Sequence, residues 1–211
     1  MSAHLNDQEL IDTLGRWWKK FGNYAVVLIL GAAVVMAGWR YWQNQQATKL
    51  ETASLYYQVL LNDVAKNQTA DAVTQANYII KNYSGSSYAN MAALFLAQLD
   101  VAQNNLPLAQ QQLQTLVKQN SSGPFQAIAS LRLARVDISL QQPQAALGLL
   151  AKIPAGYEIS YNIVRGDAYA QMKQFSDANA SYQAALNAVP QNDKPLQNMI
   201  HLRINTIPAT S

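Results

Sequence analysis

The chain begins with one long apolar segment and continues with shorter segments in which apolar and polar positions alternate with a helical period. The first segment has no charged residue from Phe21 to Trp39 and is bounded by Lys20 and Arg40. As an α-helix this run would span about 28 Å, close to the roughly 30 Å hydrocarbon core of a bilayer. We therefore expect a membrane-spanning helix over residues 21–42.

Aromatic residues flank this segment at both ends. Tryptophan and tyrosine favour the membrane–water interface, because part of each ring system is apolar and part is polar. All 4 tryptophans of the chain lie at these two ends. The residues that we expect to anchor the helix are Trp17, Trp18, Trp39, Tyr41 and Trp42.

A cleavable signal peptide is the alternative interpretation of the same segment. Its apolar region is long for a signal peptide, and a tail of roughly twenty residues precedes it. The bulky sequence from Gly38 to Trp42 also lacks the small residues of a cleavage site. An uncleaved anchor fits these features better.

Positive charges around the span predict its orientation. Arg16, Lys19 and Lys20 precede it, whereas Arg40 alone follows it closely. The positive-inside rule then places the N-terminus in the cytosol, with residues 1–20 as a cytosolic tail. Residues 43–211 would form a domain on the far side of the membrane. The inverted orientation, with this domain in the cytosol, is the alternative.

From Gln43 onward the pattern is that of successive helices with one buried face. Clusters of glycine, proline and serine separate the periodic segments, and no convincing strand pattern is present. The sequence therefore predicts an all-α domain. The expected helices cover residues 47–66, 69–82, 88–103, 106–119, 125–141, 143–152, 158–173, 175–188 and 195–206.

One helix pair near the C-terminus carries a repeat signature. Its residues at the spacings of the consensus tetratricopeptide repeat are Gly166, Tyr169, Ala178, Tyr182, Ala185 and Pro190. Small residues let the two helices approach closely, aromatic rings fill the gaps, and proline ends the second helix. The same register recurs more weakly upstream, at Ala97 with Ala109 and at Ala134 with Ala146. We expect three such units in a right-handed α–α superhelix, capped by 47–66 and 69–82 before them and by 195–206 after them.

Stacked helix pairs of this kind form a concave surface lined by the first helix of each pair. We expect this surface to be a groove that binds a partner protein. For the apolar members, burial in the core between helices is an equally good interpretation. The expected groove residues are Leu94, Gln98, Val101, Leu131, Arg135, Ile138, Ile163, Asp167 and Ala170.

Two charged features depart from the repeat consensus. Arg165 occupies a normally apolar position, so its side chain either reaches solvent or pairs with Asp137 or Asp167. Arg132 and Arg135 lie one turn apart and form a small basic face. That face is either simply solvated or suited to an acidic peptide.

Composition adds mainly exclusions. The chain has no cysteine, and its two histidines, His4 and His201, are far apart. No glycine-rich phosphate loop, nucleophile motif or paired carboxylates are recognisable. The net charge of +3 comes without a dense basic stripe. We therefore expect no enzymatic activity, cofactor, metal, small-molecule substrate or nucleic acid.

The whole chain resembles the YfgM-like ancillary subunit of the bacterial SecYEG translocon. The resemblance begins at the tail sequence from Leu14 to Gly22 and is sharpest from Gly38 to Trp42. It continues through Leu131–Val136 and Arg165–Asp167. The order of tail, span and repeats is also that of the family.

The resemblance implies a single-pass inner-membrane protein with a periplasmic tetratricopeptide-like domain. It implies association with SecYEG and with a membrane-anchored periplasmic chaperone of the PpiD type, in handing on newly exported chains. A regulatory role of the cytosolic tail is a further possibility that the family suggests. A scaffold for other envelope or cell-division complexes is the alternative function.

Overall fold

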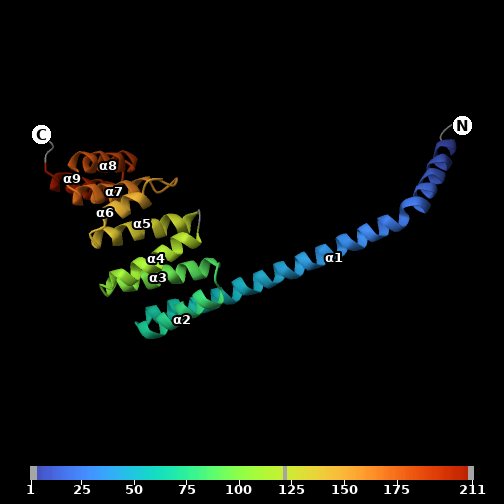
Figure 1. The fold of residues 1–211 in the computed structure, drawn as a ribbon, viewed down its shortest axis with the longest axis horizontal. Helices are drawn as coiled ribbons and strands as arrows, with labels where there is room; N and C mark the ends of the chain where they lie inside the picture. Colours follow the sequence, from blue (N-terminus) through green and yellow to red (C-terminus); the bar gives the residue numbers. More distant parts are fainter. Residues whose placement is uncertain (1–3, 121–122, 209–211) are drawn as a thin grey trace. The chain divides into compact units, whose positions relative to one another are not determined.

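The computed structural model describes residues 4–120 and 123–208, which form nine helices joined by short turns (Figure 1). These ranges contain no β-strand, so the predicted all-α fold is confirmed. The predicted helix ends agree within about two residues, with two exceptions: the helix expected to begin at residue 47 is part of a much longer helix, and the sixth helix ends earlier, at Leu149. The helices are α1 (His4–Ala65), α2 (Thr69–Asn82), α3 (Ser87–Ala102), α4 (Leu106–Gln119), α5 (Pro124–Ser139), α6 (Pro143–Leu149), α7 (Glu158–Gln171), α8 (Phe175–Ala188) and α9 (Lys194–Thr206).

Helix α1 is continuous over 62 residues and joins two segments that the sequence pattern separates. The apolar segment and the helix expected over 47–66 follow each other without a break. The residues between them, from Gln43 to Gln46, include neither proline nor glycine. Helix-compatible residues therefore leave the chain no local reason to turn there.

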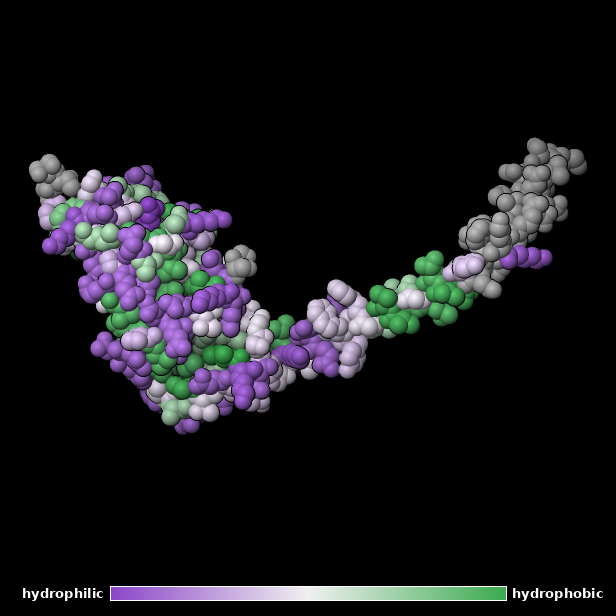
Figure 2. All heavy atoms as spheres, viewed as in Figure 1, coloured by the Kyte–Doolittle hydropathy of each residue, from purple (hydrophilic) through white to green (hydrophobic). Residues whose placement is uncertain are grey.

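The chain divides into two units, Met1–Thr52 and Ala53–Ser211. In the described part of the chain, one helix is long and apolar enough to cross a membrane. This stretch, Val26–Ala65, contains a window with a mean hydropathy of 1.4, and none of that window is buried. Figure 2 shows the corresponding apolar section of α1 in green.

The second unit is a stack of helix pairs whose turns share one conformation. The second residue after the first helix of each pair, Asn67, Asn104, Gln141 or Lys173, has a left-handed φ between 57° and 62°. The next residue's N–H donates to a carbonyl five positions earlier, a typical helix C-cap arrangement. These hydrogen bonds are Gln68 to Asp63 (2.8 Å), Asn105 to Asp100 (2.7 Å), Gln142 to Asp137 (2.8 Å) and Gln174 to Tyr169 (2.9 Å).

There are thus four helix pairs rather than the three that the repeat signature indicates. The end of α1 and α2 form the first pair, which we expected to be only a cap. Its core contains Leu60 and Ile79, both fully buried. A small residue occupies the same place in the second helix of every pair, and the four are Ala72, Ala109, Ala146 and Ala178, all fully buried.

The two helices of the fourth pair pack closely at Gly166. A Cβ built on Gly166 of α7 would overlap the ring of Tyr182 of α8. The role predicted for Gly166, close approach of two helices, is therefore confirmed. Helix α9 covers the end of this pair with Ile200, which is fully buried.

Successive pairs are also joined by hydrogen bonds from side chains to backbone carbonyls. Each bond runs from one pair to the first helix of the pair before it. The donors and acceptors are Arg132 Nη1 to Leu94 O (3.1 Å), Tyr161 Oη to Ala127 O (3.0 Å) and Gln171 Nε2 to Ile138 O (3.0 Å). The interface between the second and third pairs and that between the third and fourth pairs are thus held by apolar contacts and by directed polar contacts.

Candidate interaction groove

Three of the expected groove residues are core residues. Leu94, Leu131 and Ile163 are only 6–8% exposed. Each belongs to a different apolar core cluster. For these positions the structure supports packing, the second of the two interpretations that the sequence left open.

Three other expected residues come together at one cavity between α3, α4 and α5. Gln98 and Val101 lie on α3, and Arg135 lies on α5. The cavity has a volume of about 290 Å³. Its complete lining is Ala97, Gln98, Val101, Leu106, Leu113, Arg132, Arg135, Val136 and Ser139.

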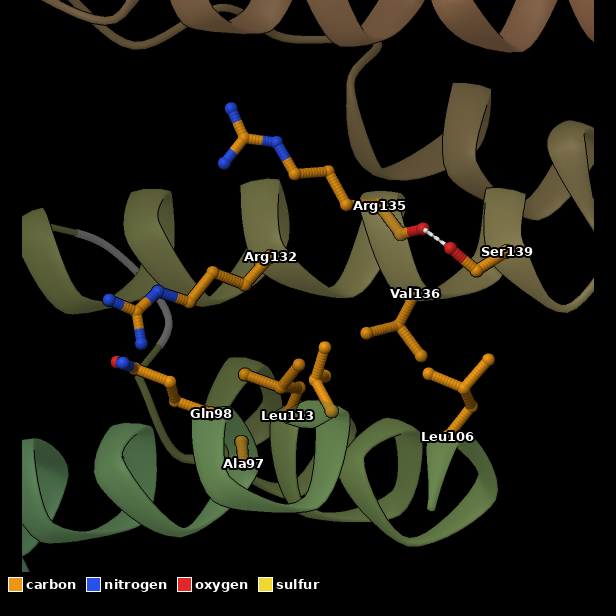
Figure 3. A pocket seen from close by; sticks show the side chains of 9 residues that line it. Ala97, Gln98, Leu106, Leu113, Arg132, Arg135, Val136 and Ser139 are labelled. Carbon is orange, nitrogen blue, oxygen red and sulfur yellow. Dashed lines mark hydrogen bonds between the residues drawn. The ribbon is translucent and has the colours of Figure 1, made fainter. Parts of the chain in front are cut away.

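The floor of this cavity was not predicted. Figure 3 shows Leu106, Leu113 and Val136 pointing into the space between the helices. Leu106 and Leu113 belong to α4, the second helix of its pair. The small side chain of Ala97 does not fill the space in front of them. Ala97 is a small residue of the repeat pattern and can be recognised in the sequence. It therefore indicates where the cavity opens.

The two arginines of the cavity have different roles. Arg132 is held by its bond to the Leu94 carbonyl and extends along the cavity edge towards Gln98 (Figure 3). Arg135 is exposed and points away from α3. Loss of water lowers the pKa of Arg135, Asp167 raises it, and Arg132 and Arg203 lower it further. An arginine remains a cation under these influences.

Asp167, another expected groove residue, is held by two neighbours. The Tyr182 hydroxyl donates to its Oδ1 at 2.8 Å, and Arg203 Nε lies 3.2 Å from the same oxygen. Burial raises the pKa of Tyr182, and the charge of Asp167 and its hydrogen bond raise it further. Arg203 was not predicted, because α9 was expected only as a cap.

Arg165 pairs with neither acid suggested by the sequence. Its Nη1 lies 3.5 Å from Asn162 Oδ1 on the same helix. Asp167 is occupied as described, and Asp137 accepts a 2.7 Å hydrogen bond from Gln110 Nε2. The pairing hypothesis for Arg165 is therefore wrong.

The remaining expected residues lie beside these features. Ile138 and Ala170 are half-buried, and the Ile138 carbonyl accepts the bond from Gln171. Of the expected membrane anchors, Trp39, Tyr41 and Trp42 are 55–69% exposed, and the rings of Trp39 and Trp42 lie 5.6 Å apart. The side chains of Trp17 and Trp18 lie outside the described residues.

Comparison with protein families matches residues 15–209 to the tetratricopeptide repeat-like domain. Among solved structures, MamA (41-end) from Desulfovibrio magneticus RS-1 has a similar fold, with a TM-score of 0.56. At 14% identity over 74% of this chain and 92% of that chain, it supports the fold alone.

Relatives named ancillary SecYEG translocon subunit occur in several bacteria. The protein from Haemophilus influenzae is 32% identical over 44% of this chain and 46% of its own length. The Escherichia coli protein is 29% identical over 46% and 47%. The match thus spans about half the length of these relatives. The Neisseria gonorrhoeae protein is 26% identical over 98% of this chain and 100% of its own length. The resemblance drawn from the sequence is confirmed.

Proposed function

This chain belongs to the tetratricopeptide repeat-like family, and we propose that it is a non-enzymatic adaptor that associates with the SecYEG translocon at the bacterial inner membrane. The observation that carries the proposal is the alignment with the Neisseria gonorrhoeae relative, which bears the translocon name and matches over its full length. The helix-pair stack supports the adaptor role, because such repeats provide extended surfaces for binding proteins.

Membrane attachment is part of this proposal. Residues 21–42 would form the span, since they lie at the apolar section of α1. Exposed Trp39, Tyr41 and Trp42 would lie at the headgroups on one side. Residues 1–20 would remain in the cytosol and 43–211 in the periplasm, as the basic residues before the span favour.

The finer part of the proposal concerns what the domain does in the periplasm. We place a chaperone of the PpiD type beside it, so that chains leaving the translocon pass to a folding factor. The family resemblance of tail, span and repeats supports this partner. The exposed cavity between α3, α4 and α5 provides a surface for one of these contacts.

The test is co-purification of the full chain from bacterial membranes in a mild detergent, with partners quantified by mass spectrometry. A matched variant carries an unrelated single-pass span in place of residues 21–42. We expect SecY, SecE, SecG and a membrane-anchored periplasmic chaperone with the unaltered chain. If the span makes the translocon contact, the variant loses the Sec subunits and keeps the chaperone.

Failure to enrich any Sec subunit above an unrelated membrane protein would overturn the translocon role. Recovery of Sec subunits without a chaperone would overturn only the chaperone contact. Enrichment of cell-division or other envelope complexes alone would replace the proposal by the scaffold function.

A further inference from the structure

The cavity between α3, α4 and α5 is too large and too open to be a packing defect. Protein interiors contain few voids larger than a water molecule, and this one measures about 290 Å³. Gln98 and Ser139 on its rim are exposed, and Val101 is 43% exposed. Solvent therefore reaches its apolar floor.

The walls are suited to an aliphatic side chain. Ala97, Leu106, Leu113 and Val136 supply apolar atoms, and Figure 3 shows the last three converging on the opening. Their arrangement is fixed because Leu113 and Val136 belong to the core cluster beneath. An inserted leucine or isoleucine would remove both its own surface and theirs from water.

The charge at the rim is positive. Arg132 and Arg135 line the cavity, and none of its nine lining residues is acidic. The acid whose charge raises the pKa of Arg135 is Asp167, and its carboxylate is already engaged by Tyr182 and Arg203. The rim therefore lacks a compensating negative charge.

From these features we infer that the cavity binds a short acidic segment of a partner protein, inserting one aliphatic side chain between α3 and α5. Carboxylates beside that side chain would pair with Arg135, an exposed arginine of the cavity lining. This inference rests on the proposed adaptor function and specifies the chemistry of one of its partners.

The test uses four labelled ten-residue peptides and the full chain in lipid nanodiscs, with binding measured by fluorescence polarisation. Two peptides are rich in glutamate and carry either leucine or serine at the centre. The third peptide keeps the central leucine and has lysines in place of the glutamates. The fourth keeps the leucine and has glutamines in their place. We expect the acidic leucine peptide to bind at least about tenfold more tightly than the other three.

Two variants locate the binding site, and each has a matched control. Arg135→Gln should weaken the acidic leucine peptide about threefold and reduce its salt dependence. Val101→Asn should weaken it about fivefold by making the wall polar. Arg165→Gln and Leu202→Asn change an arginine and an exposed aliphatic residue outside the cavity, and they should leave binding unchanged. Thermal unfolding of all four variants checks that the domain is intact.

Equal binding of the leucine peptides regardless of charge would overturn the acidic partner. Insensitivity to Val101→Asn and Arg135→Gln in folded protein would overturn the site. Displacement of the peptide by laurate at equal concentration would assign the cavity to a fatty acid. Dimers of the chain that Arg135→Gln disrupts would assign it to a second copy. If all peptides fail while SecYEG still co-purifies, this inference falls and the adaptor function stands.

Discussion

The hydroxyl of Tyr182 donates a 2.8 Å hydrogen bond to Asp167, across the interface between α8 and α7. The same carboxylate oxygen lies 3.2 Å from Arg203 Nε of α9. Three helices are thereby joined at one charged group near the C-terminal end of the stack.

Tyr182→Phe should lower the free energy of unfolding by about 1 kcal/mol, because Asp167 loses a hydrogen bond and stays partly buried. Hydrogen exchange in α9 should accelerate more than exchange in α3. Tyr169→Phe is the control, since no hydrogen bond of its hydroxyl is present in the described part of the chain. Equal effects of both changes would contradict a special role for the Tyr182 hydroxyl.

Gly166→Ala should destabilise the domain by about 1–3 kcal/mol, because the new methyl group would overlap the Tyr182 ring. Gly148→Ala is a matched change in α6, where a Cβ meets nothing within 4 Å. That variant should gain about 0.5–1 kcal/mol from helix propensity. Urea unfolding of the detergent-solubilised chain distinguishes the two, and a neutral Gly166→Ala would refute the close approach.

Gln141→Gly should stabilise the domain by about 0.5–1 kcal/mol. Gln141 is exposed and has φ 62°, a conformation that costs free energy for residues with a Cβ. Gln114→Gly, at an exposed position inside α4, should instead cost about 1 kcal/mol. The melting temperatures of the two variants provide the comparison. A lower melting temperature for both would show that the turn at Gln141 is unstrained.

Asp137→Asn should make stability less dependent on pH. Burial raises the pKa of Asp137, and the hydrogen bond from Gln110 opposes this only in part. The folded state therefore favours the protonated acid, so the unfolding free energy falls as pH rises through the raised pKa. The asparagine variant lacks this fall. Urea unfolding at pH 4.5 and pH 7.5 measures it, with Asp177→Asn at an exposed site of α8 as the control. An unchanged pH profile would contradict the prediction.

The absence of cysteine makes the membrane orientation easy to test. Single variants Ser2→Cys and Asn205→Cys should differ in their reaction with a membrane-impermeant maleimide. In spheroplasts we expect labelling at residue 205 alone, and labelling at residue 2 only after the membrane is opened. The reverse pattern would establish a cytosolic repeat domain.

From α2 onward the sequence predicts the helices well because each has a periodic apolar face and a recognisable break after it, whereas no break follows the apolar segment within α1. It predicts the repeat register where small residues are conspicuous, as at Gly166 and Ala178. The first pair was missed because Leu60, a large residue, occupies the place taken by Ala97 in the next pair. Ala72 lies 37 residues before Ala109, as Ala109 lies before Ala146, and this spacing could have revealed it.

The candidate groove was harder to predict because it depends on how deeply each side chain is buried. A periodic pattern identifies the face of α3 or α5, yet it does not distinguish Leu94, which is buried, from Val101, which is exposed. Whether Leu113 is accessible from the cavity depends on the separation of α3 and α5, the first helices of two successive pairs. The partner of Asp167 depends on the placement of α9, whose spacing follows no repeat rule.

The bonds from Arg132, Tyr161 and Gln171 to carbonyls of the preceding pair have a mechanical consequence. Each bond limits the separation of two neighbouring pairs to the reach of one side chain, so these pairs resist being pulled apart. Pulling the second, third and fourth pairs apart would have to break these hydrogen bonds as well as the apolar contacts. Single substitutions at these three positions should therefore loosen the spacing of the pairs that each side chain joins.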